Sequence, residues 1–326
     1  MEISERVTDF QAKIKSLTGE IKKCIVGNDD AIKKVIITLL SSGHVLLEGV
    51  PGVGKTLLVR TLSDALSLKF SRIQFTPDLM PADIVGTNII AETDAGKKYF
   101  EFEKGPVFTN VLLADEINRA TPKTQSALLE AMQEHKVTVL GHSHTLTEPF
   151  FVLATQNPLE MEGTYPLPEA QLDRFFFKIK ILPPSSNELK EILKKTTTEN
   201  IYKANPVLNQ SELLNMRKTV LMVPVAEHVM DFAVKLVLAT HPDTKESCAI
   251  SKKYIRYGAS PRAAQTLILS AKVNTLYDSR FNVSIQDIIE NAKEALRHRI
   301  ILNFEGESEG ISTDDIVEKI IEEIKK

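Results

Sequence analysis

The stretch that decides the fold is Gly49-Val50-Pro51-Gly52-Val53-Gly54-Lys55-Thr56, which matches the pattern GxxxxGK[ST] and is followed by Leu57. An apolar run, 45–47, precedes it and a helix-like segment, 57–66, follows it. Between a strand and a helix, such glycines let successive backbone N–H groups face phosphate oxygens, and the helix N-terminus adds a favourable dipole. We therefore predict a phosphate-binding loop in which Lys55 reaches the β and γ phosphates and the Thr56 hydroxyl ligates Mg²⁺.

Short apolar runs alternate with helix-like segments around this loop. The runs are 44–47, 70–75, 111–114, 150–154 and 175–177. This alternation is typical of an α/β fold with a buried, mostly parallel sheet. Two further segments alternate in polarity about turn residues, Thr93 to Gly96 and Gly141 to His144, and predict hairpins.

A change of pattern at Pro183-Pro184-Ser185-Ser186 predicts a domain boundary near Pro184. Downstream, the apolar periodicity is helical throughout. We predict an α/β core over 1–184, an all-α domain over 185–304, and an acidic linker with a C-terminal helix over 305–326. The expected helices of the second part are 187–197, 210–218, 225–239, 262–277, 284–303 and 313–324.

Polar side chains follow two more of the apolar runs. Asp115 and Glu116 follow 111–114, and Asn157 follows 150–154. Ligands of open α/β sheets bind at the carboxyl ends of the strands, where Asp115 can hold Mg²⁺, Glu116 can act as general base and Asn157 can orient the attacking water. Alone, the acids could cap a helix and Asn157 could be a turn residue before proline. Beside a phosphate loop, the three together favour a nucleotide-hydrolysing site.

Two arginines, Arg174 and Arg262, stand at element boundaries from which a guanidinium can reach a phosphate. Judged alone, each is typical of a surface ion pair. An arginine finger that contacts a γ-phosphate accelerates hydrolysis by about 10³- to 10⁵-fold. If either arginine has this role, most of the catalytic rate depends on it.

Composition bounds the partners and the compartment. The chain has 326 residues with 40 Lys and Arg against 43 Asp and Glu, a formal charge of −3. This near-neutral balance argues against nucleic acid as a partner. The two distant cysteines, Cys24 and Cys248, argue against a disulfide framework or a zinc site. Without a signal-peptide pattern or an apolar run of bilayer length, we expect a cytoplasmic protein with no membrane segment.

Taken together, these motifs resemble the MoxR family of AAA+ ATPases, in the helix-2-insert clade. The resemblance extends over about 25–300. The stretches that carry it are Gly49 to Thr56, Asp115 to Glu130, Ala154 to Pro158, Glu162 to Phe175, Gly258 to Ala263, and Arg297-His298-Arg299.

The resemblance implies a role for each matching residue. Lys55 and Thr56 are the Walker A pair, Asp115 and Glu116 the Walker B pair, Asn157 is sensor 1, Arg174 the arginine finger and Arg262 sensor 2. Ile25-Val26-Gly27 lines the adenine pocket, although Asn28 stands where the family often has Gln. Whether Arg262 acts in its own subunit or across an interface stays open.

The resemblance also implies architecture and work. It implies an AAA+ P-loop core with parallel sheet and a small all-α lid, with ATP or ADP and Mg²⁺ between them. It implies a helix-2 insert at about 78–107, a hairpin before sensor 1 at about 137–147, and a homo-oligomeric ring, most often a hexamer. The work is chaperone-like maturation of a protein-complex client, in some cases metal insertion, with a von Willebrand A domain partner. A nucleic-acid motor, a magnesium-chelatase-like motor subunit and a non-hydrolysing scaffold are the alternatives.

Overall fold

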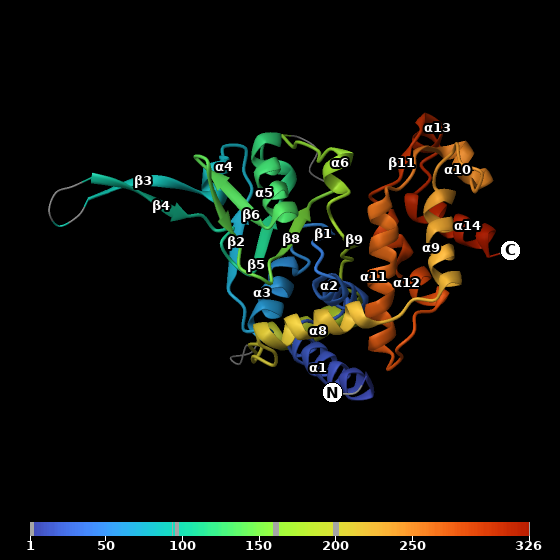
Figure 1. Cartoon of the computed structure of the whole chain (residues 1–326), viewed down its shortest axis with the longest axis horizontal. Coiled ribbons are helices and arrows are strands. Elements are labelled where there is room, and N and C mark those ends of the chain that lie inside the picture. Colours follow the sequence, from blue (N-terminus) through green and yellow to red (C-terminus); the bar gives the residue numbers. More distant parts are fainter. Residues whose placement is uncertain (1–2, 93, 95–97, 159–162, 198–201, 326) are drawn as a thin grey trace.

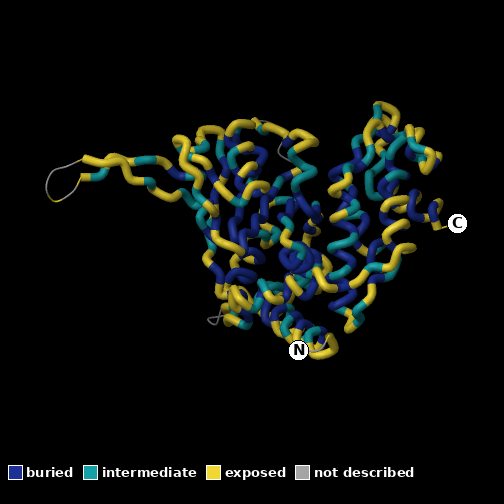
Figure 2. Tube along the Cα trace, viewed as in Figure 1, coloured by how far each residue is buried: buried dark blue, intermediate teal, exposed yellow. Residues whose placement is uncertain are grey.

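A five-stranded parallel sheet lies at the centre of the core in this computed structural model, which describes residues 3–92, 94, 98–158, 163–197 and 202–325 (Figure 1). Its order is β2-β5-β8-β1-β9. The strands are β1 (Val45–Glu48), β2 (Phe70–Gln74), β5 (Val111–Asp115), β8 (Phe151–Gln156) and β9 (Phe177–Lys180). All of β5, and all of β8 except Gln156, is buried, because helices cover both faces of the sheet (Figure 2). The predicted α/β fold is confirmed.

Helices of the amino-terminal half surround the sheet. They are α1 (Ile3–Cys24), α2 (Asp29–Leu40), α3 (Lys55–Ala65), α4 (Pro81–Val85), the 3₁₀ turn η1 (Ile117–Arg119), α5 (Pro122–Glu134) and α6 (Glu169–Leu172). In α1, buried Phe10, Ile14, Leu17 and Ile21 recur at spacings of three and four, so the helix presents one apolar face to the core.

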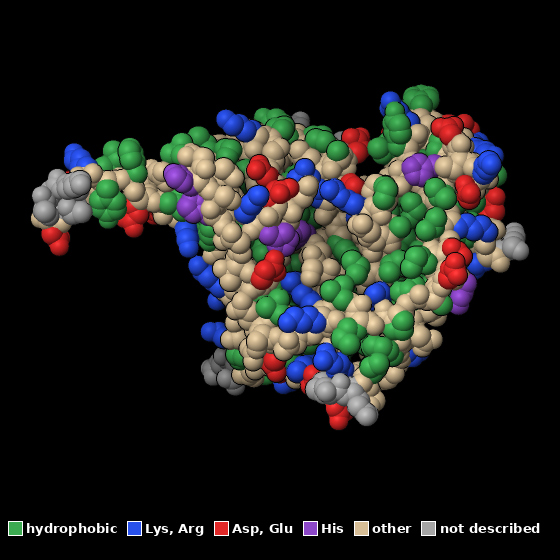
Figure 3. All heavy atoms as spheres, in the orientation of Figure 1, with side chains coloured by type: hydrophobic (Ala, Val, Ile, Leu, Met, Phe, Trp, Pro, Cys, Tyr) green, Lys and Arg blue, Asp and Glu red, His purple; other side chains and the backbone are tan. Residues whose placement is uncertain are grey.

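Two antiparallel hairpins leave this core. They are β3 (Gly86–Glu92) with β4 (Lys98–Lys104), and β6 (Lys136–Val139) with β7 (His142–Thr145). Of the predicted turn 93–96, only Asp94 lies within the described residues. The β3–β4 hairpin projects far from the core and carries exposed apolar side chains, Ile90 and Phe100 among them (Figures 1 and 3). At its base, Phe102 stacks on His144 with ring centroids 4.0 Å apart, so the two hairpins are in contact.

Helices dominate the remainder, as predicted. The elements are α7 (Ser186–Thr196), α8 (Gln210–Met222), α9 (Glu227–Ala239), α10 (Ala249–Tyr254), β10 (Ile255–Tyr257), α11 (Pro261–Tyr277), α12 (Ile285–Leu296), β11 (Ile301–Leu302), α13 (Phe304–Ser308) and α14 (Thr313–Ile324). No helix within the described residues is long and apolar enough to cross a membrane.

Two predictions in this part were wrong. The segment 305–310 is not simply a linker, because α13 forms there and packs buried Gly306 against Tyr254, leaving 3.0 Å between the Tyr254 carbonyl oxygen and a Cβ placed on this glycine. The helix expected over 284–303 ends at Leu296 instead, and Ile301–Leu302 pairs with β10. After the helix ends, the side chains of the next three residues donate to backbone carbonyls of the core, as described below.

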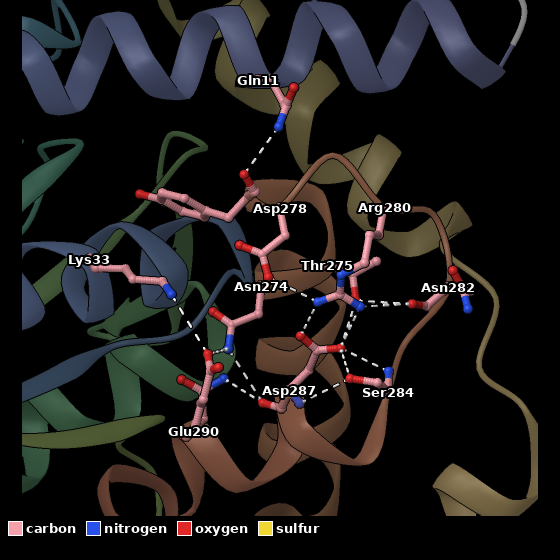
Figure 4. Close-up of polar contacts among 12 residues, drawn as sticks. Gln11, Lys33, Asn274, Thr275, Asp278, Arg280, Asn282, Ser284, Asp287 and Glu290 are labelled. Atoms are coloured by element: carbon pink, nitrogen blue, oxygen red, sulfur yellow. Dashed lines mark hydrogen bonds and ion pairs between the residues drawn. The ribbon is translucent and has the colours of Figure 1, made fainter.

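The helical part is joined to the core without a break in the apolar interior. Buried residues of α9, α11, α12 and α14 belong to the same cluster as those of α1, α2 and β1. In α8, the Arg217 Nε donates to the Leu39 carbonyl at the end of α2 over 3.0 Å. At the corner of α11 and α12, buried Asp287 accepts hydrogen bonds from Arg280, Ser284 and Thr275 (Figure 4).

Candidate nucleotide site

The loop between β1 and α3 has the backbone that phosphate binding requires. Gly52 and Gly54 adopt φ angles of 81° and 84°, in the left-handed region that glycine enters without strain. The Gly49 N–H donates to the Gln156 carbonyl over 3.3 Å, which fastens the loop to β8, and Lys55 Nζ donates to the Gly49 carbonyl over 2.5 Å. The N-cap residue of α3 is Gly54, which has no side chain to cap the helix. This helix end therefore offers its first N–H groups to an anion.

An apolar cavity of about 250 Å³ adjoins the loop, and it suits the planar base of a nucleotide. Its lining comes from the end of α1 through the first turns of α2, from the phosphate loop and the start of α3, and from Ile181 through α7. The residues are Cys24, Ile25, Val26, Asn28, Ile32, Gly52, Val53, Gly54, Lys55, Leu57, Leu58, Ile181, Pro184, Ile192, Lys195 and Thr196. Ile25, Val26, Val53 and Leu57 are thus brought together. Gly49, Val50, Pro51 and Thr56 are not part of this wall.

Gly27, between the lining residues Val26 and Asn28, is not itself part of the lining but approaches α7 closely. Its φ is 72°, and an added Cβ would lie 2.2 Å from Oε1 of Glu188 in the first turn of α7. The positive φ, which glycine adopts without strain, and this close approach together favour glycine after Ile25 and Val26. Nucleotide was expected between the core and the helical part, and the cavity lies there, because Ile192, Lys195 and Thr196 of α7 line it together with the phosphate loop.

The acids at the end of β5 are held by one buried hydroxyl. Thr155 Oγ1 donates to Asp115 Oδ1 over 2.6 Å and accepts the backbone N–H of Glu116 over 2.8 Å. On its other oxygen, Asp115 accepts Arg72 Nη2 over 2.7 Å. Glu116 has a φ of 56°, a left-handed conformation that is unfavourable for glutamate and that the Thr155 contact stabilises.

The Glu116 carboxylate points to a polar edge of the sheet. Its Oε2 accepts Gln74 Nε2 over 2.7 Å and Arg119 Nη1 over 2.9 Å. None of the roles predicted from the sequence falls on Arg72, Gln74, Arg119 or Thr155. A signal existed for two of them: Arg72 and Gln74 stand two apart in a strand, so they share one face.

The oxygen donors present suit Mg²⁺. Asp115 supplies a carboxylate at the end of β5, and Thr56 supplies an exposed hydroxyl in the first turn of α3. Mg²⁺ prefers such oxygen ligands in small number, completed by phosphates and water. Asn157, only 4% exposed, directly follows β8, next to β1 and β5.

The two arginines lie elsewhere. Arg174 and Arg262 line a second cavity, of about 370 Å³, together with residues 41–44 that precede β1. The phosphate loop follows β1, whose four residues span about 13 Å. In the view of Figure 3, the surface is recessed between the core and the C-terminal helices. The structure therefore places Arg174 and Arg262 together, but not at the phosphate loop of their own chain.

The side chains in this second cavity are anchored. Arg174 Nη1 donates to the Leu129 carbonyl over 2.8 Å, and Arg262 Nη1 lies 3.5 Å from Asp173 Oδ2. Burial lowers the pKa of His44 to about 3, so its ring is neutral. It accepts the Val152 N–H at Nδ1 and donates from Nε2 to the Met132 carbonyl, which fixes the wall behind the arginines.

Comparison with known families and proteins agrees with this architecture. Residues 44–177 match the ATPase family associated with various cellular activities (AAA), and residues 248–320 match the AAA lid domain. The chain is 43% identical to Chaperone MoxR1 of Mycobacterium tuberculosis over 94% of this chain and 80% of that protein. It is 27% identical to Protein MoxR of Paracoccus denitrificans over 92% of both chains.

A solved structure is similar throughout. The crystal structure of a candidate ATPase from Cytophaga hutchinsonii superposes with a TM-score of 0.91 at 43% identity, over 98% of this chain and 96% of the other. The family matches, the near full-length relatives and the nucleotide-site geometry agree with one another. The chain belongs to the MoxR family of AAA+ ATPases and is itself an ATPase with an α/β core and a helical lid.

Proposed function

We propose that this ATPase works as a ring, in which each nucleotide is bound by one subunit and completed by the arginines of the next, and that hydrolysis of ATP to ADP and phosphate drives chaperone-like remodelling of a protein complex. One observation carries the proposal: Arg174 and Arg262 lie together beyond the opposite end of β1 from the phosphate loop. If these arginines serve a nucleotide, they serve that of a neighbouring subunit, because they are remote from the phosphate loop of their own chain. A head-to-tail interface that closes on itself makes a ring, and six subunits is the number we propose.

Within one subunit, each residue has a defined task. Lys55 and the N–H groups of the loop bind the β and γ phosphates. Bound Mg²⁺, held by Thr56 and Asp115, would neutralise charge on those phosphates. We assign to Glu116 the removal of a proton from the attacking water, and to Asn157 the orientation of that water. We assign the base to the apolar cavity beside Ile25 and Val26.

The neighbour supplies the remaining charge. As the γ-phosphoryl group separates, negative charge builds on its oxygens, and a guanidinium placed there stabilises the transition state more than the ground state. We assign this role to Arg174 and to Arg262 acting across the interface. To act in its own subunit, Arg262 would have to leave Asp173 and move past the edge strand β9 to the phosphate loop. Its contact with Asp173 favours the position away from that loop.

Client contact is assigned to the β3–β4 hairpin. Ile90 and Phe100, a cross-strand pair, are 66% and 74% exposed. Exposed apolar groups on a projecting arm are typical of protein contacts. Chaperone MoxR1 is a relative by sequence, and the same class of work is proposed here, with a von Willebrand A domain protein as partner.

Capture of the client tests this proposal. Glu116→Gln, tagged and loaded with ATP, is purified from extract of the native cell, and the bound proteins are identified by mass spectrometry. We expect a specific enzyme complex or a von Willebrand A domain protein that is lost with ADP and with Ile90→Ser/Phe100→Ser. Recovery of DNA with replication proteins, and ATP turnover stimulated by DNA in a salt-sensitive way, would contradict the chaperone assignment.

A further inference from the structure

The tripeptide Arg297-His298-Arg299 fastens the lid to the strand that follows the arginine finger. Arg297 Nη1 donates to the Lys178 carbonyl over 3.1 Å, and His298 Nε2 donates to the Phe175 carbonyl over 3.0 Å. Burial lowers the pKa of His298 well below its ordinary value, so the neutral ring donates from Nε2. Three consecutive lid side chains thus bind backbone carbonyls of residues 173–178 of the core, a range that ends within the first two residues of β9.

Arg299 is the centre of this contact. Its side chain is 2% exposed, and it donates from Nε to Asp173 Oδ1 over 2.8 Å. Its Nη2 donates to the Phe175 carbonyl over 2.7 Å, and its Nη1 to the carbonyls of Phe176 and Ala295. The guanidinium therefore spans the residues on both sides of Arg174 and the last turn of α12. Only the planar five-donor fork of arginine can satisfy so many carbonyls at once.

Asp173 connects the same group to the second arginine. Its Oδ1 accepts both Arg299 Nε and the Ser260 hydroxyl, the latter over 2.7 Å, and its Oδ2 lies 3.5 Å from Arg262 Nη1. Ser260 caps α11, whose second residue is Arg262. The carboxylate of Asp173, the residue before Arg174, therefore contacts both Ser260 and Arg262 at the N-terminus of α11.

We propose that Arg299 and Asp173 are positioning residues, which lock Arg174 and Arg262 into one rigid two-arginine unit presented to the neighbouring subunit. This inference rests on the proposed function, because it needs both arginines to serve the neighbour's nucleotide. It adds that the alignment of the pair is set by a buried lid-to-core contact rather than by the interface. Movement of the lid against β9 would then displace both arginines together.

The test is the substitution Arg299→Lys, which retains a positive charge beside Asp173 but loses the fork. We expect a folded protein that binds ATP at its own loop with unchanged affinity, while kcat falls by about 10- to 100-fold, since a misplacement of about 1 Å costs that much. A role in folding alone would not separate kcat from affinity in this way. The matched control is Arg280→Lys, which weakens another arginine–aspartate pair of the lid, with Asp287, and should lower the melting temperature with turnover retained.

Mixing separates the two proposals. Lys55→Ala subunits keep intact arginines but lack a working loop, so they should restore turnover to Arg299→Lys subunits and equally to Arg174→Ala subunits. Recovery with Arg174→Ala but not with folded, ATP-binding Arg299→Lys would overturn the positioning role alone. Absence of recovery with Arg174→Ala, in confirmed mixed oligomers, would overturn the proposed interface instead. Wild-type kcat in Arg299→Lys would also overturn the inference.

Discussion

Thr155 Oγ1 donates a 2.6 Å hydrogen bond to Asp115 Oδ1, and the same oxygen accepts the N–H of Glu116, so one fully buried hydroxyl sets both acids of the site. Thr155→Val keeps the shape and removes the hydroxyl, leaving the Glu116 N–H without its acceptor. We expect kcat to fall by about 10-fold or more, because an unsatisfied polar group costs about 1 to 3 kcal/mol and the acids lose alignment. Steady-state turnover measures this, and Thr155→Ser should restore it; equal loss in both variants would contradict the assignment.

Glu116→Gln tests the general base. An amide accepts no proton from water at neutral pH, so we expect turnover to fall by about 10²- to 10⁴-fold, with ATP binding retained. Equilibrium binding of a fluorescent ATP analogue and phosphate release give the two quantities. Glu322→Gln, an exposed carboxylate on α14, should match the wild type. Near-normal turnover in Glu116→Gln would remove this residue from the mechanism.

Gly27→Ala tests the contact between α7 and the segment that contributes Val26 and Asn28 to the nucleotide cavity. The new Cβ meets Glu188 and the φ of 72° becomes strained, so we expect about 10-fold weaker ATP binding from about 1 to 3 kcal/mol of local cost. Isothermal calorimetry measures it. Gly19→Ala is the control: it faces open space within α1 and should stabilise the fold slightly, by about 1 kcal/mol or less. Unchanged affinity in Gly27→Ala would show that α7 does not bound the site.

Asp287→Asn tests the corner of the lid drawn in Figure 4. Burial raises the pKa of Asp287, but the hydrogen bonds from Arg280 and Ser284 outweigh it and the net shift is downward. A carboxyl with a lowered folded pKa contributes stability that is present above its unfolded pKa of about 3.9 and is lost as pH falls through the folded value. We expect the variant to lose roughly 2 kcal/mol near neutral pH, less than a fully buried pair because Arg280 is partly exposed.

Urea unfolding of Asp287→Asn and wild type at several pH values checks this sign. The difference between them should be constant from about pH 8 to pH 5 and shrink only below about pH 4. A difference that grows with acidity would contradict the assigned shift.

Much of the fold could be predicted from local pattern. Within a dozen residues, the sequence from Val45 to Lys55 predicts a strand, a turn and the start of a helix. Because the sheet is parallel, the carboxyl ends of all its strands then lie at one edge. The periodic spacing of apolar residues predicted the helices of the lid. The end of α12 could not be predicted in this way. Arg297 and Arg299 beyond it bind backbone carbonyls more than 100 residues away in the sequence, and local periodicity does not show such contacts.

The site was predicted less completely for the same physical reason. Lys55, Asp115 and Glu116 stand in recognisable spacings, whereas Gln74 and Thr155 act through side-chain contacts across neighbouring strands, which a single sequence does not encode locally. The placement of Arg262 depends on how the lid packs against β9. Only the packed structure separates it from the phosphate loop of its own chain.

The most direct test of the shared site is the ATP turnover of a mixture. Lys55→Ala subunits carry intact arginines, and Arg174→Ala/Arg262→Ala subunits carry an intact loop; each should be inactive alone. In equimolar mixed rings, the account predicts recovery of up to about a quarter of wild-type turnover, the fraction of interfaces that join an intact loop to intact arginines. Turnover that stays at background, while native mass spectrometry shows mixed oligomers, would contradict a site completed by the neighbouring subunit.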